Sequence, residues 1–206
     1  MSRGKRNRRW LREHQRDSYV KSAKQAGYRS RSAYKLAQMD DRDGIFRPGQ
    51  TVVDLGAAPG GWSQVAAARV APGGRVIALD RLPMEALPGV TILQLDVLEA
   101  GLDKALTTAL GEDRADVVMS DMAPNISGIR DVDQARALEL ALNALRIAES
   151  ALCAPGTFLV KAFQGSDTDQ LVAALHARFD RVDVRKPGAS RDKSSEIYLL
   201  ARGYGV

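Results

Sequence analysis

The sequence is poor in the residues that build disulfides and metal centres. Among its 206 residues are one cysteine, Cys153, and two histidines, His14 and His176. A single cysteine cannot form an internal disulfide, and no paired Cys or His spacing of the zinc-binding kind is present. These counts fit a reducing compartment. They predict a cytoplasmic protein without a metal site.

Long apolar runs are lacking as well. Charge or glycine interrupts every apolar segment well before the roughly 18 residues that a membrane-crossing helix requires. The chain does not open with the charged, apolar and small-residue series of a signal peptide. With 45% hydrophobic residues, it can still bury one sizeable core. We therefore expect a soluble monomer with no membrane partner.

Positive charge is concentrated at the N-terminus. Residues 1–35 hold twelve Lys and Arg against two acids, a net charge of +10, whereas residues 36–206 carry −5. Four of the eleven aromatic residues lie among these cations, namely Trp10, Tyr19, Tyr28 and Tyr34. Guanidinium groups hold phosphates and rings stack on unpaired bases, so this composition favours RNA or single-stranded nucleic acid. We predict an RNA-binding arm over residues 1–34 and a folded domain over 35–206.

Two other kinds of segment would also be basic. One is a solubilising tail, and the other is an Arg-rich presequence that targets an organelle. Two acids and few serines fit a presequence poorly, so nucleic acid stays the favoured partner.

The rest of the chain alternates short apolar runs with helical patterns. The runs that are typical of buried strands lie at 51–55, 75–80, 90–97, 116–121, 157–163 and 196–201. This alternation predicts a parallel sheet with helices on both faces. A polar loop without a helix joins 181–184 to 196–201, which predicts an antiparallel hairpin at one edge. The expected fold class is α/β, Rossmann-like, with a mostly parallel seven-stranded sheet.

The clearest helical pattern covers residues 133–152. Apolar residues recur there at steps of three and four, which predicts one buried stripe. The stripe consists of Ala135, Leu138, Leu142, Leu145, Ala148 and Leu152. We expect the sequence Ala154-Pro155-Gly156 to end this helix.

A glycine-rich turn follows the first predicted strand, in VVDLGAAPGGW at 52–62. In open α/β sheets, the first strand-to-helix turn is where a nucleotide-like cofactor approaches the main chain. Gly56, Gly60 and Gly61 permit positive φ and lack the Cβ atoms that would keep a ligand away. The spacing is not the G-x-G-x-x-G of dinucleotide enzymes, and Pro59 removes an amide donor that a pyrophosphate needs. The turn therefore favours a cofactor without a diphosphate.

Acids lie at the ends of three of the predicted strands, at Asp80, Asp96 and Asp121. An acid after the second strand suits the two hydroxyls of a ribose, and the next one suits the amino group of an adenine. Adenosine without phosphates, joined through a sulfonium to a methionine tail, is S-adenosylmethionine. This is the cofactor that we expect. Asp54, inside the first predicted strand, is expected to be structural or to lie near the cofactor without binding it.

Five segments carry a resemblance to a known family. They are SRSAYKL (30–36), DLGAAPGGW (54–62), SDMAPNISG (120–128), LVKAFQG (159–165) and KPGASRDKSSEIYLL (186–200). Together they resemble, over nearly the whole chain, the FtsJ family of RlmE-type (RrmJ) methyltransferases. The resemblance implies S-adenosylmethionine-dependent 2′-O-methylation of a uridine ribose in the 23S ribosomal RNA of the large subunit. It implies ribosomal RNA, in the assembled or assembling large subunit, as the partner.

The resemblance also implies the site residues. The family's catalytic K-D-K-E tetrad corresponds to Lys35, Asp121, Lys161 and Glu196. Its cofactor contacts correspond to Gly60, Trp62, Asp80, Asp96 and Asp121.

Lys161 is expected to be the general base that accepts the proton of the ribose hydroxyl. A lysine can do this only when neutral, which at pH 7 needs a pKa about 3 units below the reference near 10.4. Burial and a second cation, Lys35, lower that pKa, whereas the carboxylates of Asp121 and Glu196 raise it. The balance between them stays open at this stage.

Two alternative functions share parts of this pattern. A dinucleotide-dependent oxidoreductase would share the sheet and Asp80, but it needs a different glycine spacing and a site for hydride transfer. A non-catalytic RNA-binding protein would explain the basic arm, but it has no need for all four residues of the tetrad. Transfer of a labelled methyl group to RNA separates the three.

Overall fold

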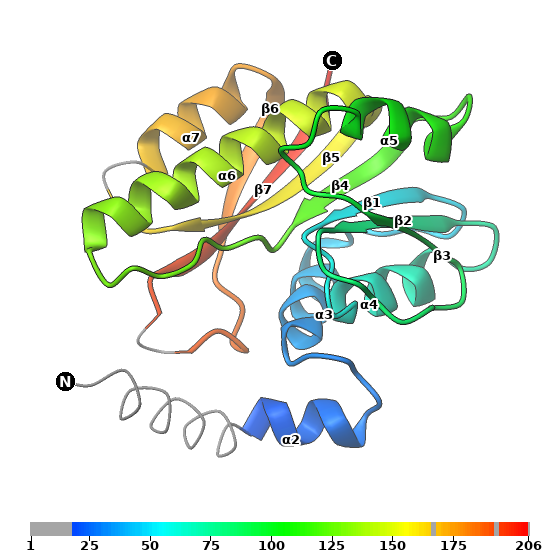
Figure 1. Ribbon diagram of the computed structural model, residues 1–206, viewed down its shortest axis with the longest axis horizontal. Coiled ribbons are helices and arrows are strands. Elements are labelled where there is room, and N and C mark those ends of the chain that lie inside the picture. The colour runs from blue at the N-terminus through cyan, green and yellow to red at the C-terminus, as the bar shows by residue number, and fades with distance from the viewer. Residues whose placement is uncertain (1–17, 166–167, 192–193, 206) are drawn as a thin grey trace.

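The computed structural model describes residues 18–165, 168–191 and 194–205 (Figure 1). Its centre is a seven-stranded sheet in the order β3-β2-β1-β4-β5-β7-β6. The strands from β3 to β5 in this order run parallel, and β7 is antiparallel to both β5 and β6. The predicted Rossmann-like sheet and its edge hairpin are confirmed. The strands are β1 (Thr51–Leu55), β2 (Arg75–Asp80), β3 (Val90–Gln94), β4 (Ala115–Ser120), β5 (Leu152–Phe163), β6 (Phe179–Arg185) and β7 (Glu196–Tyr204).

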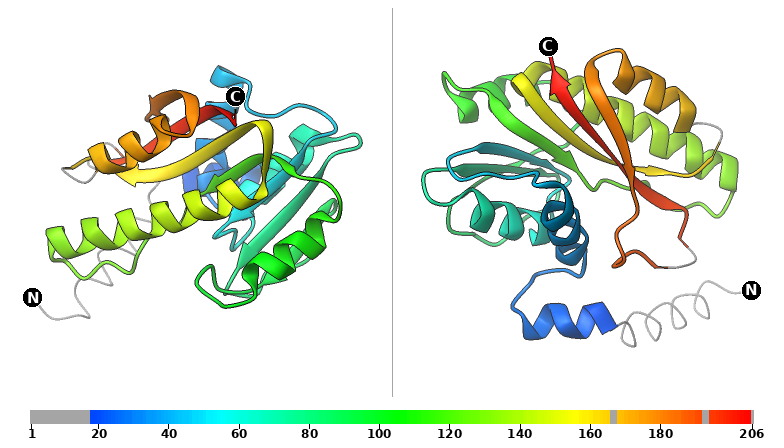
Figure 2. Two further views of the ribbon diagram at one scale, coloured as in Figure 1. Left: turned by 90° about the horizontal axis from the view of Figure 1, so that it is seen from above. Right: turned by 180° about the vertical axis from the view of Figure 1, so that it is seen from behind.

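Helices cover both faces of the sheet. In Figures 1 and 2, α3 and α4 lie on one face, and α5, α6 and α7 lie on the other. In the part of the chain that the structure describes, no helix is both long enough and apolar enough to cross a membrane. The described helices are α2 (Ser18–Gln25), α3 (Ser32–Asp43), α4 (Gly61–Val70), α5 (Leu102–Leu110), α6 (Arg130–Ala151) and α7 (Thr168–His176).

Each face of the sheet has its own apolar core. All five residues of β1 are buried, and they alternate between the two faces, as strand geometry requires. Val53 and Leu55 belong to the core shared with α5, α6 and α7, whereas Val52 belongs to the core shared with α3 and α4. Burying one such side chain contributes roughly 1.5–3 kcal/mol. The near-continuous apolar runs of the sequence reflect this burial on both faces.

Several strand boundaries differ from the sequence prediction, among them those of β5 and β3, and β7 extends to Tyr204 where its end was expected at residue 201. The strand expected at 157–163 begins at Leu152, directly after α6. Leu152 pairs with Ala115 and Thr157 pairs with Val117, so residues 153–156 bulge out of the ladder. The bulge accommodates Pro155, which has no N–H to donate to the ladder. The other strand, expected at 90–97, ends at Gln94, so that Asp96 lies in the turn that follows.

The long helix α6 starts at Arg130, earlier than expected, and its buried stripe is shorter than predicted. Ala135 is exposed, and none of the residues 130–140 is buried. Burial begins at Ala141 and continues through Leu145 and Ala148. The predicted stripe is therefore wrong at Ala135, whereas Leu138 and Leu142 are partly buried and pack against the core.

The structure describes only part of the predicted RNA-binding arm at residues 1–34, beginning at Ser18. Residues 1–17, with Trp10, lie outside the described residues. From Ser18 onward the segment is folded, and the boundary expected between residues 34 and 35 falls inside α3. The ring of Tyr34 lies 5.5 Å from that of Tyr19 and 5.3 Å from that of Tyr28, and Tyr28 packs against the core beneath α3. The folded body therefore begins well before residue 35.

Candidate active site

A cavity of about 360 Å³ opens at the carboxyl ends of β1, β2 and β4. This is the edge at which open α/β sheets bind their ligands. The three predicted strand-end acids all line it. The lining residues are Gly56, Ala58, Asp80, Arg81, Leu82, Leu95, Asp96, Val97, Leu98, Asp121, Met122, Ala123, Pro124, Asn125 and Leu140.

Backbone amides orient two of these acids. One oxygen of Asp80 accepts a hydrogen bond from the N–H of Ala58 at 2.9 Å, and the other accepts from Leu82 at 2.8 Å. Asp96 accepts from the N–H of Leu98 at 3.1 Å. Such bonds hold the carboxylates in place before any ligand arrives, which reduces the ordering cost of binding.

The glycine turn is crowded by the chain itself. Gly56 and Gly60 have positive φ, as expected for this turn. A Cβ atom on Gly56 would collide with Met122, and one on Gly61 would collide with Ser30. A Cβ on Gly60 would lie 3.0 Å from Nη1 of Arg29. Close approach therefore explains these glycines, but at all three the approaching atoms include side chains of this protein, a contact that the local sequence did not reveal.

Two predicted cofactor residues do not line the cavity. Gly60 lies beneath Arg29 in the turn. Trp62 is 2% exposed, its indole N–H donates to the carbonyl of Ser32 at 2.9 Å, and its ring packs 5.6 Å from that of Tyr198. The side chain of Trp62 is thus part of the core. The first amides of a helix have no partner inside it, so Trp62 can still offer its backbone N–H at the start of α4.

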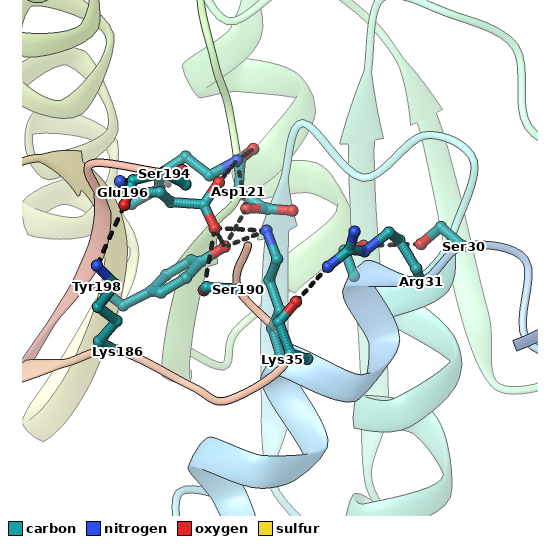
Figure 3. A network of polar contacts seen from close by, with 12 residues as sticks. Ser30, Arg31, Lys35, Asp121, Lys186, Ser190, Ser194, Glu196 and Tyr198 are labelled. Carbon is teal, nitrogen blue, oxygen red and sulfur yellow. Dashed lines mark hydrogen bonds and ion pairs between the residues drawn. The ribbon is translucent and has the colours of Figure 1, made fainter. Parts of the chain in front are cut away.

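The four tetrad residues converge from four separate segments, and Figure 3 labels three of them, Lys35, Asp121 and Glu196. Nζ of Lys161 lies 2.6 Å from Oδ1 of Asp121 and 3.5 Å from Oε2 of Glu196, and it donates at 3.0 Å to the carbonyl of Asp121. Nζ of Lys35 lies 2.5 Å from Oε1 of Glu196. The four side chains are between 8% and 17% exposed. Two ammonium groups thus face two carboxylates, which is the pairing that buried charges require.

Tyr198 is a fifth member of this cluster that the sequence prediction missed. Its hydroxyl donates to Oδ1 of Asp121 at 2.8 Å, and it lies 3.1 Å from Oε1 of Glu196 and 3.3 Å from Nζ of Lys35. A signal for it was available, because residues two apart on a strand share a face and Glu196 starts β7. Tyr198 also lies directly opposite Lys161 in the ladder between β7 and β5.

The ionisation states follow from these contacts. Burial by itself lowers the pKa of Lys161, but the carboxylates of Asp121 and Glu196 outweigh it and hold that pKa above its ordinary value. Burial raises the pKa of Glu196, but Lys161 and Lys35 together outweigh it and lower that pKa. Burial, with the charges of Asp121 and Glu196, raises the pKa of Tyr198 well above its usual range. In the resting cluster these shifts keep Lys161 an ammonium group, Glu196 a carboxylate and Tyr198 a neutral phenol.

Arg29 joins the two segments that flank the cavity. Its guanidinium donates to the carbonyl of Pro59 in the glycine turn at 3.3 Å. It also donates to the carbonyls of Glu85 and Ala86, after β2, at 2.8 Å each. In the sequence, Arg29 is one of the cations of the predicted RNA-binding arm. Its contacts instead join the segment after β2 to the glycine turn, whose Gly56 and Ala58 line the cavity.

We expect Arg29→Ala to weaken cofactor binding about tenfold, or about 1.4 kcal/mol, because both flanking segments lose a charged hydrogen-bond donor. Arg75→Ala is the matched control. Arg75 donates to the carbonyl of Leu110 at 2.6 Å and to Asp113 at 3.0 Å. It begins β2, so it lies at the amino ends of the strands, whereas the cavity lies at their carboxyl ends. Calorimetry should give a weaker affinity for Arg29→Ala alone. Equal affinities for the two variants would contradict the role of Arg29 in the cavity.

Asp54 carries an unusual buried carboxyl group near the cavity. It is 1% exposed, one oxygen accepts from the hydroxyl of Ser63 at 2.6 Å, and the other oxygen has no hydrogen-bond partner. Burial raises the pKa of Asp54 to about 7 against the opposing bond from Ser63, and the charges of Asp121 and Asp80 add to the increase. Because the folded protein holds this proton more tightly than the unfolded chain, stability is lost as the pH rises from about 3.8 to about 7.

We therefore expect Asp54→Asn to stabilise the protein more at pH 8 than at pH 5, by about 2–3 kcal/mol, since the amide carries no charge to bury. Asp40→Asn is the control. Asp40 is also buried, but it accepts from the N–H groups of Ile45 at 2.9 Å and Phe46 at 3.0 Å. Its replacement should destabilise at both pH values. Denaturant unfolding measures both variants, and a gain for Asp54→Asn that does not change with pH would contradict the buried ionisation.

Comparison with known proteins gives the chain its relatives. The model of the FtsJ-like methyltransferase family matches residues 28–204. A protein of Alkalilimnicola ehrlichii named "Ribosomal RNA large subunit methyltransferase E" is 54% identical over 97% of this chain and 96% of its own length. A protein of Pseudomonas aeruginosa with the same name is 50% identical over 99% of both chains. A crystal structure named as a ribosomal RNA methyltransferase from Plasmodium falciparum covers 86% of this chain and 98% of its own, with a TM-score of 0.78 and 29% identity. The chain therefore belongs to the FtsJ-like methyltransferase family.

Proposed function

We propose that this enzyme transfers the methyl group of S-adenosylmethionine to the ribose 2′-oxygen of a uridine in large-subunit ribosomal RNA. The observation that carries the proposal is the position of Lys161. Its ammonium group lies between Asp121 and Glu196, and Asp121 also lines the 360 Å³ cavity. Asp121 therefore connects the proposed proton acceptor, Lys161, with the candidate cofactor cavity. The full-length relatives named for methylation of large-subunit ribosomal RNA support this choice of substrate.

The residues of the cavity fit the cofactor. Its walls combine apolar side chains, among them Val97, Leu98 and Leu140, with three carboxyl groups. Apolar walls suit a purine ring, and oriented carboxylates suit ribose hydroxyls, an adenine amino group and a cationic tail. We assign Asp80 to the ribose, Asp96 to the adenine and Asp121 to the charged end. When bound, the cofactor supplies an electrophilic methyl group on a sulfonium.

The tetrad prepares the acceptor. A ribose hydroxyl is a weak nucleophile, so the enzyme gains from a base and from strict alignment of the acceptor. Nζ of Lys161, once neutral, accepts the proton of the 2′-hydroxyl as that oxygen forms its bond to the methyl carbon. Lys35 holds Glu196 at 2.5 Å, and Tyr198 donates to Asp121 at 2.8 Å. These contacts fix the carboxylates of Asp121 and Glu196, which in turn hold the side chain of Lys161 in position.

The partner and setting follow from the same proposal. We propose that residues 1–17 contribute charge to RNA binding, because they hold seven Lys and Arg against two acids. The substrate is RNA in the assembled or assembling large subunit, and the enzyme acts as a monomer in the cytoplasm.

The test is transfer of a labelled methyl group from S-adenosylmethionine to two substrates, purified ribosomal RNA and large subunits, both from cells that lack this gene. We expect label in RNA at one uridine, which then resists alkaline cleavage because its 2′-oxygen is blocked. Greater transfer to the subunit would identify the particle as the substrate. Label in protein, on a base or nowhere would refute the proposed reaction.

A further inference from the structure

A second cavity lies on the other side of the segment that follows β4. Its volume is about 210 Å³. That is below the roughly 300 Å³ at which pockets for drug-sized ligands begin, so it suits one small ring system. Pro124 lines both this cavity and the larger one. The lining residues are Pro124, Ile126, Arg130, Asp133, Gln134, Phe163 and Ser195.

Half of the large exposed apolar side chains among the described residues line one of the two cavities. Six large ones are exposed among the described residues, namely Leu82, Leu98, Ile126, Ile129, Val132 and Val184. Leu82 and Leu98 line the larger cavity, and Ile126, 69% exposed, lines the smaller one. Ile129 and Val132 follow a few residues later along the chain. Exposed apolar groups that cluster in this way mark a binding surface.

Several walls of the smaller cavity are neighbours of the tetrad residues along the chain or in the sheet. Phe163 is two residues after Lys161 on β5, and Ser195 directly precedes Glu196. Pro124 is three residues after Asp121. Phe163 and Glu196 are opposite each other in the ladder, and the N–H of Gln164 donates to the carbonyl of Ser195 at 2.8 Å, which ties two walls together. Three lining residues of the cavity therefore lie within three positions of a tetrad residue along the chain.

We infer that this 210 Å³ cavity receives the base of the nucleotide whose ribose is methylated, an assignment that rests on the proposed function. The methyl donor and the acceptor nucleotide must be held together at the reacting atoms, and the larger cavity is assigned to the cofactor. The 2′-carbon of a ribose is bonded to the carbon that carries the base. If the 2′-oxygen lies beside Lys161, the base of the same nucleotide lies next to the tetrad, separated from it only by the ribose ring.

The lining fits a base. Phe163 supplies an aromatic ring, Pro124 and Ile126 supply apolar surface, and stacking on such groups is how proteins hold bases that have left a helix. Arg130 adds a cation at the same cavity. The loop that carries Ile126 is held by Asp133, which accepts from Ser127 N–H at 2.7 Å and from Gly128 N–H at 3.0 Å. These hydrogen bonds order the loop in the protein without RNA, so the surface of the cavity is preformed.

The experiment compares two RNA substrates after the methylated nucleotide has been mapped. One carries its natural base there, and the other keeps the ribose and its 2′-hydroxyl but lacks the base. Phe163→Ala should lower kcat/KM on the natural RNA by about 5- to 150-fold, the effect of one lost stacking contact of 1–3 kcal/mol. On the abasic RNA, Phe163→Ala and the unmodified enzyme should be equal. Cofactor affinity by calorimetry should not change.

Two further variants keep the test decisive. Ile126→Ala removes an exposed side chain, so it tests the same cavity even if Phe163→Ala does not fold. Val184→Ala is the matched control, because Val184 is 55% exposed on the edge strand β6, outside both cavities. Equal losses on both RNAs, or no loss on either, would overturn the base assignment while methyl transfer by the unmodified enzyme still upheld the proposed function. No transfer to RNA by the unmodified enzyme would refute the proposed function itself, and the base site with it.

Discussion

Deleting residues 1–17 is expected to remove much of the salt dependence of RNA binding. These residues contain seven cations: Arg3, Lys5, Arg6, Arg8, Arg9, Arg12 and Arg16. Each neutralised phosphate on single-stranded RNA adds about 0.7 to the slope of log affinity against log salt. If all seven contact phosphates, the deletion lowers that slope by about 5. Across the range from about 50 to 200 mM salt, this corresponds to roughly a thousandfold change in affinity.

The structure sets where the cut is made. A deletion to residue 28 would remove α2 and Tyr28, which packs against the core beneath α3. A deletion to residue 17 leaves these contacts and those of Arg29 in place, so cofactor affinity should not change. Replacing the seven cations by Gln in the full chain is the matched control, because it removes charge but keeps Trp10. Equal salt slopes for the full and shortened proteins would contradict an electrostatic role for this segment.

The fold could be predicted because its signals are local. A strand that is buried on both faces reads as a short apolar run, and β1, β2 and β4 lie within one residue of the predicted positions. The bulge at 153–156 could not be predicted, because it depends on which residues of β4 lie opposite. The exposed start of α6 could not be predicted either, since an apolar stripe is buried only as far as a neighbouring surface extends.

The site was predictable where residues lie in strong local motifs, and it was not where side chains meet from distant segments. Asp80 ends β2 and Asp121 follows β4, and both line the cavity because it opens at the carboxyl ends of these strands. Trp62 lies in the same glycine-rich motif, yet its side chain faces the core. Arg29 looked like one more cation of a basic segment, although its partners are carbonyls 30 to 57 residues away. Charge counting does not distinguish a cation that binds RNA from one that holds a loop.

The raised pKa of Lys161 changes what its role as a base requires. In the cofactor-free protein, Asp121 and Glu196 keep the lysine protonated at neutral pH, so only a small fraction is neutral. A bound sulfonium repels an ammonium group and lowers that pKa, as does desolvation when RNA covers the site. The neutral fraction still grows tenfold with each pH unit below the pKa. We therefore expect the single-turnover rate to rise with pH at a slope near one until the pKa of Lys161 in the complex is reached.

Lys161→Ala is expected to bind cofactor and RNA almost normally and to lose at least about 10²-fold in turnover, the usual contribution of positioned proton transfer. Lys161→Arg is the stricter test. Arginine keeps the positive charge opposite Asp121 and Glu196, but it does not deprotonate in proteins. A purely electrostatic role predicts that arginine restores most of the rate, whereas a base predicts that it restores none. Lys35→Arg is the matched control, because Lys35 contacts Glu196 and Tyr198 without touching Asp121 in the described cluster, and its charge is what we expect to matter. Single-turnover methyl transfer at saturating cofactor and RNA decides between the roles, and a Lys161→Arg rate within about tenfold of the unmodified enzyme would show that Lys161 is not the base.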